Sequence, residues 1–215
     1  MKKERVTPVY YPKNEELFSA ILHGIGALFG IFALCYTIML SAESGSAVSL
    51  SASIIYGVSL IITYTFSTLS HALCPKGAKK VFRVLEHNSI FLLIAGTYTP
   101  VTLLILKGAF GWVIFGIQWI IAILGIIFNS IALNRFKKLS LIIYIAMGWL
   151  IIIAAFPLLH QMAPSDLIYL LGGGIFYTAG AIFYRIGKAG MHAIWHLFAL
   201  VGSILQFFAI HSYLR

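Results

Sequence analysis

The chain has 215 residues, of which 60% are hydrophobic and only 10% are charged. Soluble domains carry about 25% charged residues, so this composition excludes a water-soluble globule. The formal net charge of +9 would suit a nucleic-acid-binding protein, but the basic residues are confined to short segments between long apolar runs. We therefore expect membrane lipid, and no nucleic acid, as the partner of these basic residues.

Seven long runs without Asp, Glu, Lys or Arg divide the sequence. Each has 18 residues or more, and they cover 17–42, 44–75, 87–106, 108–134, 139–165, 167–184 and 189–214. About 20 apolar residues cross the ~30 Å hydrocarbon core, where only helices and closed barrels satisfy the backbone. Continuous apolar runs, rather than ten-residue alternation, exclude a barrel. We predict an all-α bundle of seven transmembrane helices at about 17–40, 47–71, 84–106, 110–132, 139–160, 166–185 and 191–212.

The predicted helices form one domain, 17–212, between an N-terminal tail, 1–16, and a short C-terminal tail, 213–215. Thirteen of the fifteen lysines and arginines lie on the N-terminal tail and on every second connection after it; they are Lys2, Lys3, Arg5, Lys13, Lys76, Lys79, Lys80, Arg83, Arg135, Lys137, Lys138, Arg185 and Lys188. The other two are Lys107 and Arg215. Because such an excess marks the cytoplasmic face, we predict a cytoplasmic N-terminus and an external C-terminus.

In this orientation, polar residues of four predicted helices meet at the cytoplasmic level. They are Glu16, Ser19 and His23 on the first helix, Ser67 and His71 on the second, Glu86 and His87 on the third, and His192 and His196 on the seventh. Ionisable groups within membrane spans usually face the bundle interior and have a partner. Residues four apart share a helix face, so the two histidines of the seventh helix point the same way.

A metal ion is one such partner, because neutral imidazoles are good zinc ligands. We predict a zinc ion held by His71, His192 and His196, with Glu16, Ser19 and His23 around these ligands. Three histidines with a water in the fourth position form a catalytic, open zinc site. Cys74, one turn after the first ligand, is an alternative fourth ligand that would close the site.

The remaining polar and aromatic residues have simpler interpretations. A lone histidine near a helix end is usually an interfacial residue, and we interpret His87, His160 and His211 in this way. Trp195, between the two histidines of the seventh helix, is expected to pack or to face lipid. The small residues of "LGGGIFYTAG" (171–180) predict close contact with a neighbouring helix.

The chain resembles the bacterial hemolysin III proteins, a branch of the progestin and adipoQ receptor family that is related to the alkaline ceramidases. Four stretches carry the resemblance: "EELFSAILHGIGAL" (15–28), "STLSH" (67–71), "EHNSIFLLIAGTYTP" (86–100) and "HAIWHLFALVGS" (192–203). The resemblance implies a seven-helix bundle in a bacterial cell membrane, with one zinc ion near the cytoplasmic face. The ligands that it implies are the three histidines named above.

The resemblance also implies roles for two further residues. Ser67 and the acid on the third helix, here Glu86, would lie beside a zinc-bound water. Relatives usually carry Asp at the position of Glu86, Asn at that of Ser19 and, in many cases, His at that of Gln206. The longer Glu86 either reaches the metal directly or holds the water from further away.

Zinc lowers the pKa of a bound water toward ~7, and a neighbouring carboxylate can take its proton and deliver it to a leaving group. These parts lie at the depth of lipid linkages. They favour a ceramidase-like hydrolase of a lipid amide or ester, with Glu86 and Ser67 as catalytic residues. Two alternatives stay open: a receptor-like or regulatory membrane protein with structural zinc, and a pore-forming hemolysin or channel. The outer halves of the predicted helices lack the charged or polar stripe that would line a water-filled channel.

Overall fold

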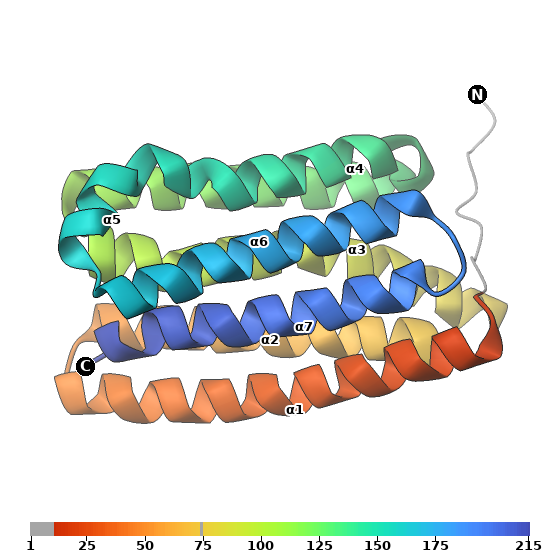
Figure 1. Ribbon diagram of the computed structural model, residues 1–215, viewed down its shortest axis with the longest axis horizontal. Helices are drawn as coiled ribbons and strands as arrows, with labels where there is room; N and C mark the ends of the chain where they lie inside the picture. Colours follow the sequence, from red (N-terminus) through yellow and green to blue (C-terminus); the bar gives the residue numbers. More distant parts are fainter. Residues whose placement is uncertain (1–10, 74) are drawn as a thin grey trace.

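The computed structural model describes residues 11–73 and 75–215, and these residues form a bundle of helices without strands (Figure 1). The helices are α1 (Lys13–Ser44), α2 (Ala47–Ala72), α3 (Lys76–Pro100), α4 (Gly108–Trp149), α5 (Ala155–Gln161), α6 (Pro164–Ile186) and α7 (Met191–Ile210). Shorter turns are the π-helical η1 (Val101–Leu106) and the 3-10 helices η2 (Leu150–Ala154) and η3 (His211–Tyr213). Six helical runs are long and apolar enough to cross a membrane.

Two helices begin earlier than predicted. Helix α1 begins at Lys13 rather than at residue 17, and α3 begins at Lys76 rather than at residue 84. The early start of α3 places Lys79 and Arg83 on a helix, and the two side chains are only 5% and 8% exposed. The prediction that they lie in a connecting loop was therefore wrong. It was based on a count of charges, which contains no information on contacts such as that between Lys79 and Glu16.

We predicted two separate helices where the structure has the continuous run of α4, η2 and α5. Within α4, Ala132 has a non-helical backbone with φ −152° and ψ 65°. Gln118 Nε2 donates to the carbonyl of Met147 at 2.8 Å, and Ser140 Oγ donates to Asn129 Oδ1 at 2.7 Å. The two parts of α4 therefore fold back on each other at the break and run antiparallel.

Glycines bring the helices of the bundle close together. A Cβ atom on Gly57 of α2 would lie 2.6 Å from Leu34 of α1, and one on Gly173 of α6 would lie 2.6 Å from Gln206 Nε2 of α7. A Cβ on Gly180 would lie 2.8 Å from the Trp195 ring. Small residues allow such close approach in membrane bundles. The contacts at Gly173 and Gly180 confirm the packing role predicted for the glycines of α6.

Tyr64 links three helices near the middle of the bundle. Its ring lies over Gly26 of α1 and meets His23 edge-on, with ring centroids 4.9 Å apart. Its hydroxyl shares a 2.6 Å hydrogen bond with Ser203 Oγ of α7 and donates to the carbonyl of Ala199. A single fully buried side chain on α2 thus fixes the positions of α1 and α7 beside it.

The two ends of the bundle carry different polar clusters. Helices α1, α3 and α7 begin and α2 ends at one end, which we call the histidine end because it holds His71, His192 and His196 (Figure 1). At the opposite end, which we call the serine end, Ser41 of α1 contacts Ser49 and Ser53 of α2. The candidate site lies at the histidine end.

Candidate metal centre

Three imidazoles from two helices converge at the histidine end. His71 lies in the last turn of α2, and His192 and His196 lie in the first two turns of α7. Helix α7 begins there because Gly190, with φ 81°, occupies the left-handed region that glycine adopts without strain. The Nε2 atom of His71 lies 3.3 Å from that of His192 and 3.0 Å from that of His196, and the last two atoms are 2.9 Å apart.

The spacing of these nitrogens suits a bound metal ion. A tetrahedral site with metal–nitrogen bonds of about 2.0–2.1 Å has ligand atoms about 3.4 Å apart. Glu86 Oε1 of α3 lies 3.5 Å from the Nε2 atom of His71, which is the same spacing. All four residues are buried, and their nearest ligand atoms lie within 4.8 Å of one another. This buried cluster, His71, Glu86, His192 and His196, could hold a metal ion.

Glu86 belongs to the ligand group by distance rather than lying beyond it. Ser67, one turn before His71, donates its hydroxyl to Glu86 Oε1 at 2.7 Å. The serine is 1% exposed, so this bond is shielded from solvent and fixes the carboxylate. The geometry places the longer carboxylate where it can reach a metal ion directly, which is one of the two positions that the sequence left open.

Glu16 holds His71 from the side opposite the ligand group. Its Oε2 atom accepts a hydrogen bond from His71 Nδ1 at 2.7 Å, and its Oε1 atom accepts from Lys79 Nζ at 2.7 Å and from the backbone N–H of Tyr11 at 3.1 Å. A carboxylate accepts only, so Nδ1 carries the proton and Nε2 keeps its lone pair for an ion. Carboxylates of this kind orient metal-bound histidines and raise their basicity.

His23 lies beside His196, the second histidine of α7, in a similar way. Its Nε2 atom lies 2.9 Å from His196 Nδ1, and the two rings meet edge-on with centroids 4.0 Å apart. One of these two nitrogens carries a proton and donates it to the other. Ser19 differs from these two: its hydroxyl is fully buried and has no hydrogen-bond partner among the described residues.

Tyr11 covers the third ligand, and no sequence pattern had marked it. Its ring stacks on that of His192, with centroids 4.3 Å apart and planes 8° from parallel. Burial, reinforced by the negative charge of Glu86, raises the pKa of the Tyr11 phenol to about 12, so the ring stays neutral. Glu15 accepts a hydrogen bond from the Gly190 N–H at 3.0 Å. Residues near the start of α1 thus contact the start of α7.

His87 is not the interfacial residue that we predicted. Its side chain is buried, its Nδ1 atom lies 2.9 Å from the carbonyl oxygen of Arg83, and its Nε2 atom lies 3.3 Å from the Tyr184 hydroxyl. It turns away from Glu86 as expected for adjacent helix positions, but the turn directs it into the bundle. Cys74, the alternative fourth ligand, lies outside the described residues.

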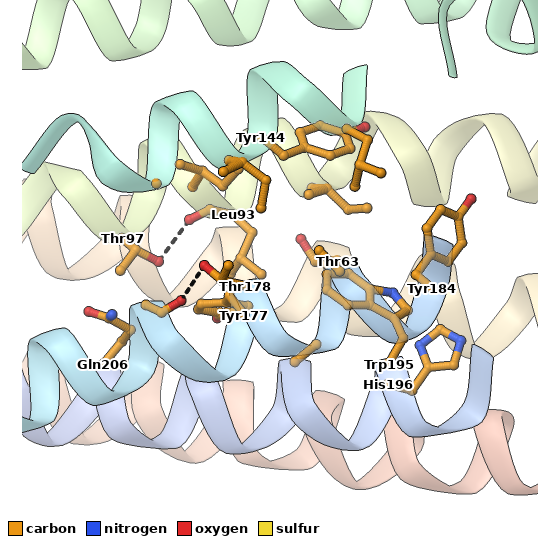
Figure 2. A pocket seen from close by; sticks show the side chains of 18 of the residues that line it. Thr63, Leu93, Thr97, Tyr144, Tyr177, Thr178, Tyr184, Trp195, His196 and Gln206 are labelled. Atoms are coloured by element: carbon orange, nitrogen blue, oxygen red, sulfur yellow. Dashed lines mark hydrogen bonds between the residues drawn. The ribbon is translucent and has the colours of Figure 1, made fainter. Parts of the chain in front are cut away.

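A cavity of about 150 Å³ extends from the ligand group along the inside of the bundle. Figure 2 shows His196, Trp195 and Tyr184 toward one end and Gln206 toward the other. His196 and Gln206 are ten residues apart on α7, which corresponds to about 15 Å. The apolar part of the lining includes Leu93, Ile94, Val101, Ile145, Leu170 and Ala199. Trp195 lines the cavity and also packs against Gly180 of α6, which is the packing role that the sequence suggested.

The chain is similar to several known proteins. The Haemolysin-III related family model matches residues 11–207. The chain is 44% identical to "Hemolysin-3" of Bacillus cereus, covering 98% of this chain and 96% of that protein. It is 42% identical to "Hemolysin-3 homolog" of Bacillus subtilis (strain 168), covering 93% and 94%. It is 28% identical to the human "Monocyte to macrophage differentiation factor", covering 74% of this chain and 69% of that protein.

Proposed function

We propose, from the premise that the chain belongs to the Haemolysin-III related family and is a multi-pass protein of the bacterial cell membrane, that it is a zinc-dependent hydrolase of a lipid amide or ester. The observation that carries the proposal is the buried cluster of three imidazoles and one carboxylate at the head of an apolar cavity. Such a cavity suits an acyl chain, and the cluster suits the polar linkage at its end.

We further propose seven membrane crossings with a cytoplasmic N-terminus. The hairpin within α4 supports two crossings by that run, and the distribution of lysine and arginine supports the orientation. In this arrangement residues 17–212 form the membrane domain, and the histidine end lies in the cytoplasmic leaflet. Alkaline phosphatase fused to the C-terminus should be active, since the enzyme works only outside the cytoplasm. An inactive but stable fusion would contradict an odd number of crossings.

Zinc suits the ligand set, because neutral imidazole nitrogens and a carboxylate oxygen are its usual partners. When bound, the ion would supply Lewis-acid polarisation of a carbonyl and activation of water. Glu16 and His23 hold His71 and His196 in the tautomers that present Nε2 to the ion. These two contacts are the roles that we propose for the residues predicted to surround the ligands; Ser19 has no such contact.

In the proposed reaction, Glu86 accepts a proton from the attacking water and Ser67 holds the carboxylate in place. A bond forms between the water oxygen and the carbonyl carbon, and the bond from that carbon to the amide nitrogen or ester oxygen breaks. Glu86 passes its proton to the departing nitrogen or oxygen. The products are a fatty acid and an amine or alcohol, and the acyl chain occupies the cavity.

The test combines metal analysis with a lipid panel. Purified native protein should contain one zinc ion per chain, and the triple variant His71→Ala, His192→Ala, His196→Ala should contain none. The zinc-loaded native protein should release fatty acid from at least one class among ceramides, phospholipids and acylglycerols. The hydrolase proposal fails if no lipid is cleaved while a Haemolysin-III relative cleaves one under the same conditions.

A second function is favoured by the position of Glu86. With its oxygen 3.5 Å from the Nε2 atom of His71, the carboxylate can complete a four-ligand, closed site, which is typical of structural zinc. The ion would then fasten α2, α3 and α7 in a receptor-like or regulatory membrane protein. X-ray absorption of the zinc-loaded protein distinguishes the two functions: a water among four ligands supports the hydrolase, and three imidazoles plus a protein carboxylate support the fastening role.

A further inference from the structure

One lysine stands out among the residues that line the large cavity. Of the described lining residues, Lys137 is the one lysine or arginine. It is half-buried, and its Nζ atom lies 5.0 Å from the centre of the Tyr184 ring, which lines the same cavity. Contact with an aromatic face holds an ammonium group in position. In the part of the chain that the structure describes, Lys137 forms no ion pair.

Arg83 provides a second positive charge beside the first. Its side chain is 8% exposed and lines a smaller cavity that shares Glu86, His87, Tyr184 and His192 with the large one. The charges of Arg83 and Lys137 repel each other, and Glu86 attracts Lys137. We call Arg83 and Lys137 the cationic pair.

The ammonium group of a lysine is costly to place beside an apolar cavity of a membrane protein unless an anion approaches it. Basic pockets between transmembrane helices on the cytoplasmic side bind anionic lipid headgroups for this reason. We propose that Lys137 binds the phosphate of an anionic membrane lipid whose acyl chain lies in the apolar cavity. This inference rests on the proposed lipid hydrolase and identifies its substrate class as a phosphate-bearing lipid with a net negative headgroup.

The cavity favours a lipid over a soluble phosphate. The walls beyond Lys137 are formed mainly by apolar side chains such as Leu141 and Ile145, which offer a free phosphate ion nothing to bind. An acyl chain would cover these walls while its headgroup meets the cationic pair. A zwitterionic headgroup would bring a positive charge close to Lys137 and Arg83, so repulsion should make it bind more weakly than an anionic one.

The chain offers a matched pair of variants for the test. Lys137→Ala and Lys138→Ala remove the same charge from adjacent positions, but Lys138 is exposed and lines neither cavity. The full-length, zinc-loaded proteins are titrated with ether-linked phosphatidic acid, which has no ester to cleave, and with ether-linked phosphatidylcholine. Binding is measured by native mass spectrometry, and zinc content and Tm are measured on the same samples.

We expect the native protein to prefer the phosphatidic acid, and Lys137→Ala to weaken its binding by about 10-fold or more, as for loss of a charge-assisted hydrogen bond. Lys138→Ala should stay within about 2-fold of the native protein, and Lys137→Arg should restore binding. Zinc content should be equal in all of them. If Lys137→Ala fails to fold, Lys137→Gln replaces it. Equal effects of the two alanine variants, or equal binding of the two lipids, would overturn the headgroup site.

The lipid source and the hydrolase are tested separately. Inorganic phosphate that displaces the ether lipid at the concentration at which the lipid itself binds would identify a soluble anion as the ligand and overturn the lipid headgroup. Because the ether lipids are not hydrolysed, binding that depends on Lys137 without cleavage of any ester lipid would remove the hydrolase and keep the headgroup site. Cleavage of an ester lipid that is unaffected by Lys137→Ala would keep the hydrolase and remove the headgroup site.

Discussion

The serine end and the histidine end are both buried polar clusters between helices, but they differ in how their polar atoms are satisfied. At the serine end, Ser41 Oγ lies 2.5 Å from Ser53 Oγ, Ser49 Oγ donates to the carbonyl of Leu214 at 2.5 Å, and Ser53 Oγ donates to the carbonyl of Thr37 at 3.2 Å. Hydroxyl groups both donate and accept, so this cluster is complete without a ligand.

At the histidine end, three nitrogens face one another within 3.3 Å. The Nδ1 proton of His71 is directed outward to Glu16, so the Nε2 atom of His71 presents a lone pair to the other two nitrogens. A nitrogen lone pair that faces other acceptors is satisfied only by a proton or a cation between them. A buried polar cluster with an acceptor directed at other ring nitrogens is a candidate ligand site, whereas a cluster whose hydroxyl groups pair among themselves is a contact between helices.

The largest effect that would break this comparison is loss of a ligand at the histidine end. His196→Ala should weaken zinc binding by more than the ~10–100-fold typical of residues outside the coordination shell. Competition with a chromophoric chelator measures the affinity. Unchanged zinc affinity would show that the three imidazoles do not form a metal site. Ser49→Ala, at the serine end, is the control and should retain full zinc affinity.

Glu16→Gln should have the next largest effect. The amide can still accept from His71 Nδ1, but it removes the negative charge shared by His71 and Lys79. We expect zinc affinity to fall by ~10–100-fold, with the zinc still bound through the same three nitrogens. The same chelator competition, together with X-ray absorption, checks both expectations. An affinity equal to that of the native protein would mean that Glu16 only pairs with Lys79.

Substitution at the serine end should affect stability alone. Ser49→Ala removes the donor to the Leu214 carbonyl and the contact with Ser41 Oγ. Leaving a buried partner unsatisfied costs about 1–3 kcal/mol, so the Tm of the purified protein should fall. A differential scan with and without chelator should show the same decrease in both states. A decrease that appears only in the zinc-loaded protein would mean that the two ends are coupled.

The smallest effect is expected for Ser19→Ala. The Ser19 hydroxyl is buried without a partner among the described residues, so its removal also removes a desolvation cost. Tm should stay equal or rise slightly, by a free energy of less than about 1 kcal/mol, and zinc affinity should stay within about 2-fold. A fall in zinc affinity like that of Glu16→Gln would restore the role that the sequence suggested for Ser19.

The sequence was most informative where spacing along a helix determines geometry. His192 and His196 share a face because they are four residues apart, and His71 could be placed at their level from the lengths of the apolar runs. Membrane dimensions limit each helix to a narrow range of depths, so residues distant in sequence could be aligned by depth alone. The ligand set predicted in this way coincides with three of the four residues of the buried cluster.

Contacts that depend on rotation about a helix axis could not be predicted. Lys79 and Arg83 were counted as loop charges, yet both lie buried on α3, and Lys137 lines the cavity although Lys138 does not. A count of positive residues assigns all of them to one side of the membrane and carries no information on which helix face they occupy. Tyr11 lay in a segment without apolar periodicity, so nothing in the pattern placed it over His192.

The separation of the ligands in the chain has a consequence for biosynthesis. His71 and His196 are 125 residues apart, and the second lies near the start of the last helix. The chain from His71 to His196 must therefore be translated, and α7 must leave the translocon, before the four residues of the buried cluster can meet. Assembly of the buried cluster therefore follows the insertion of α7, and a chain that ends before α7 lacks two of its four residues.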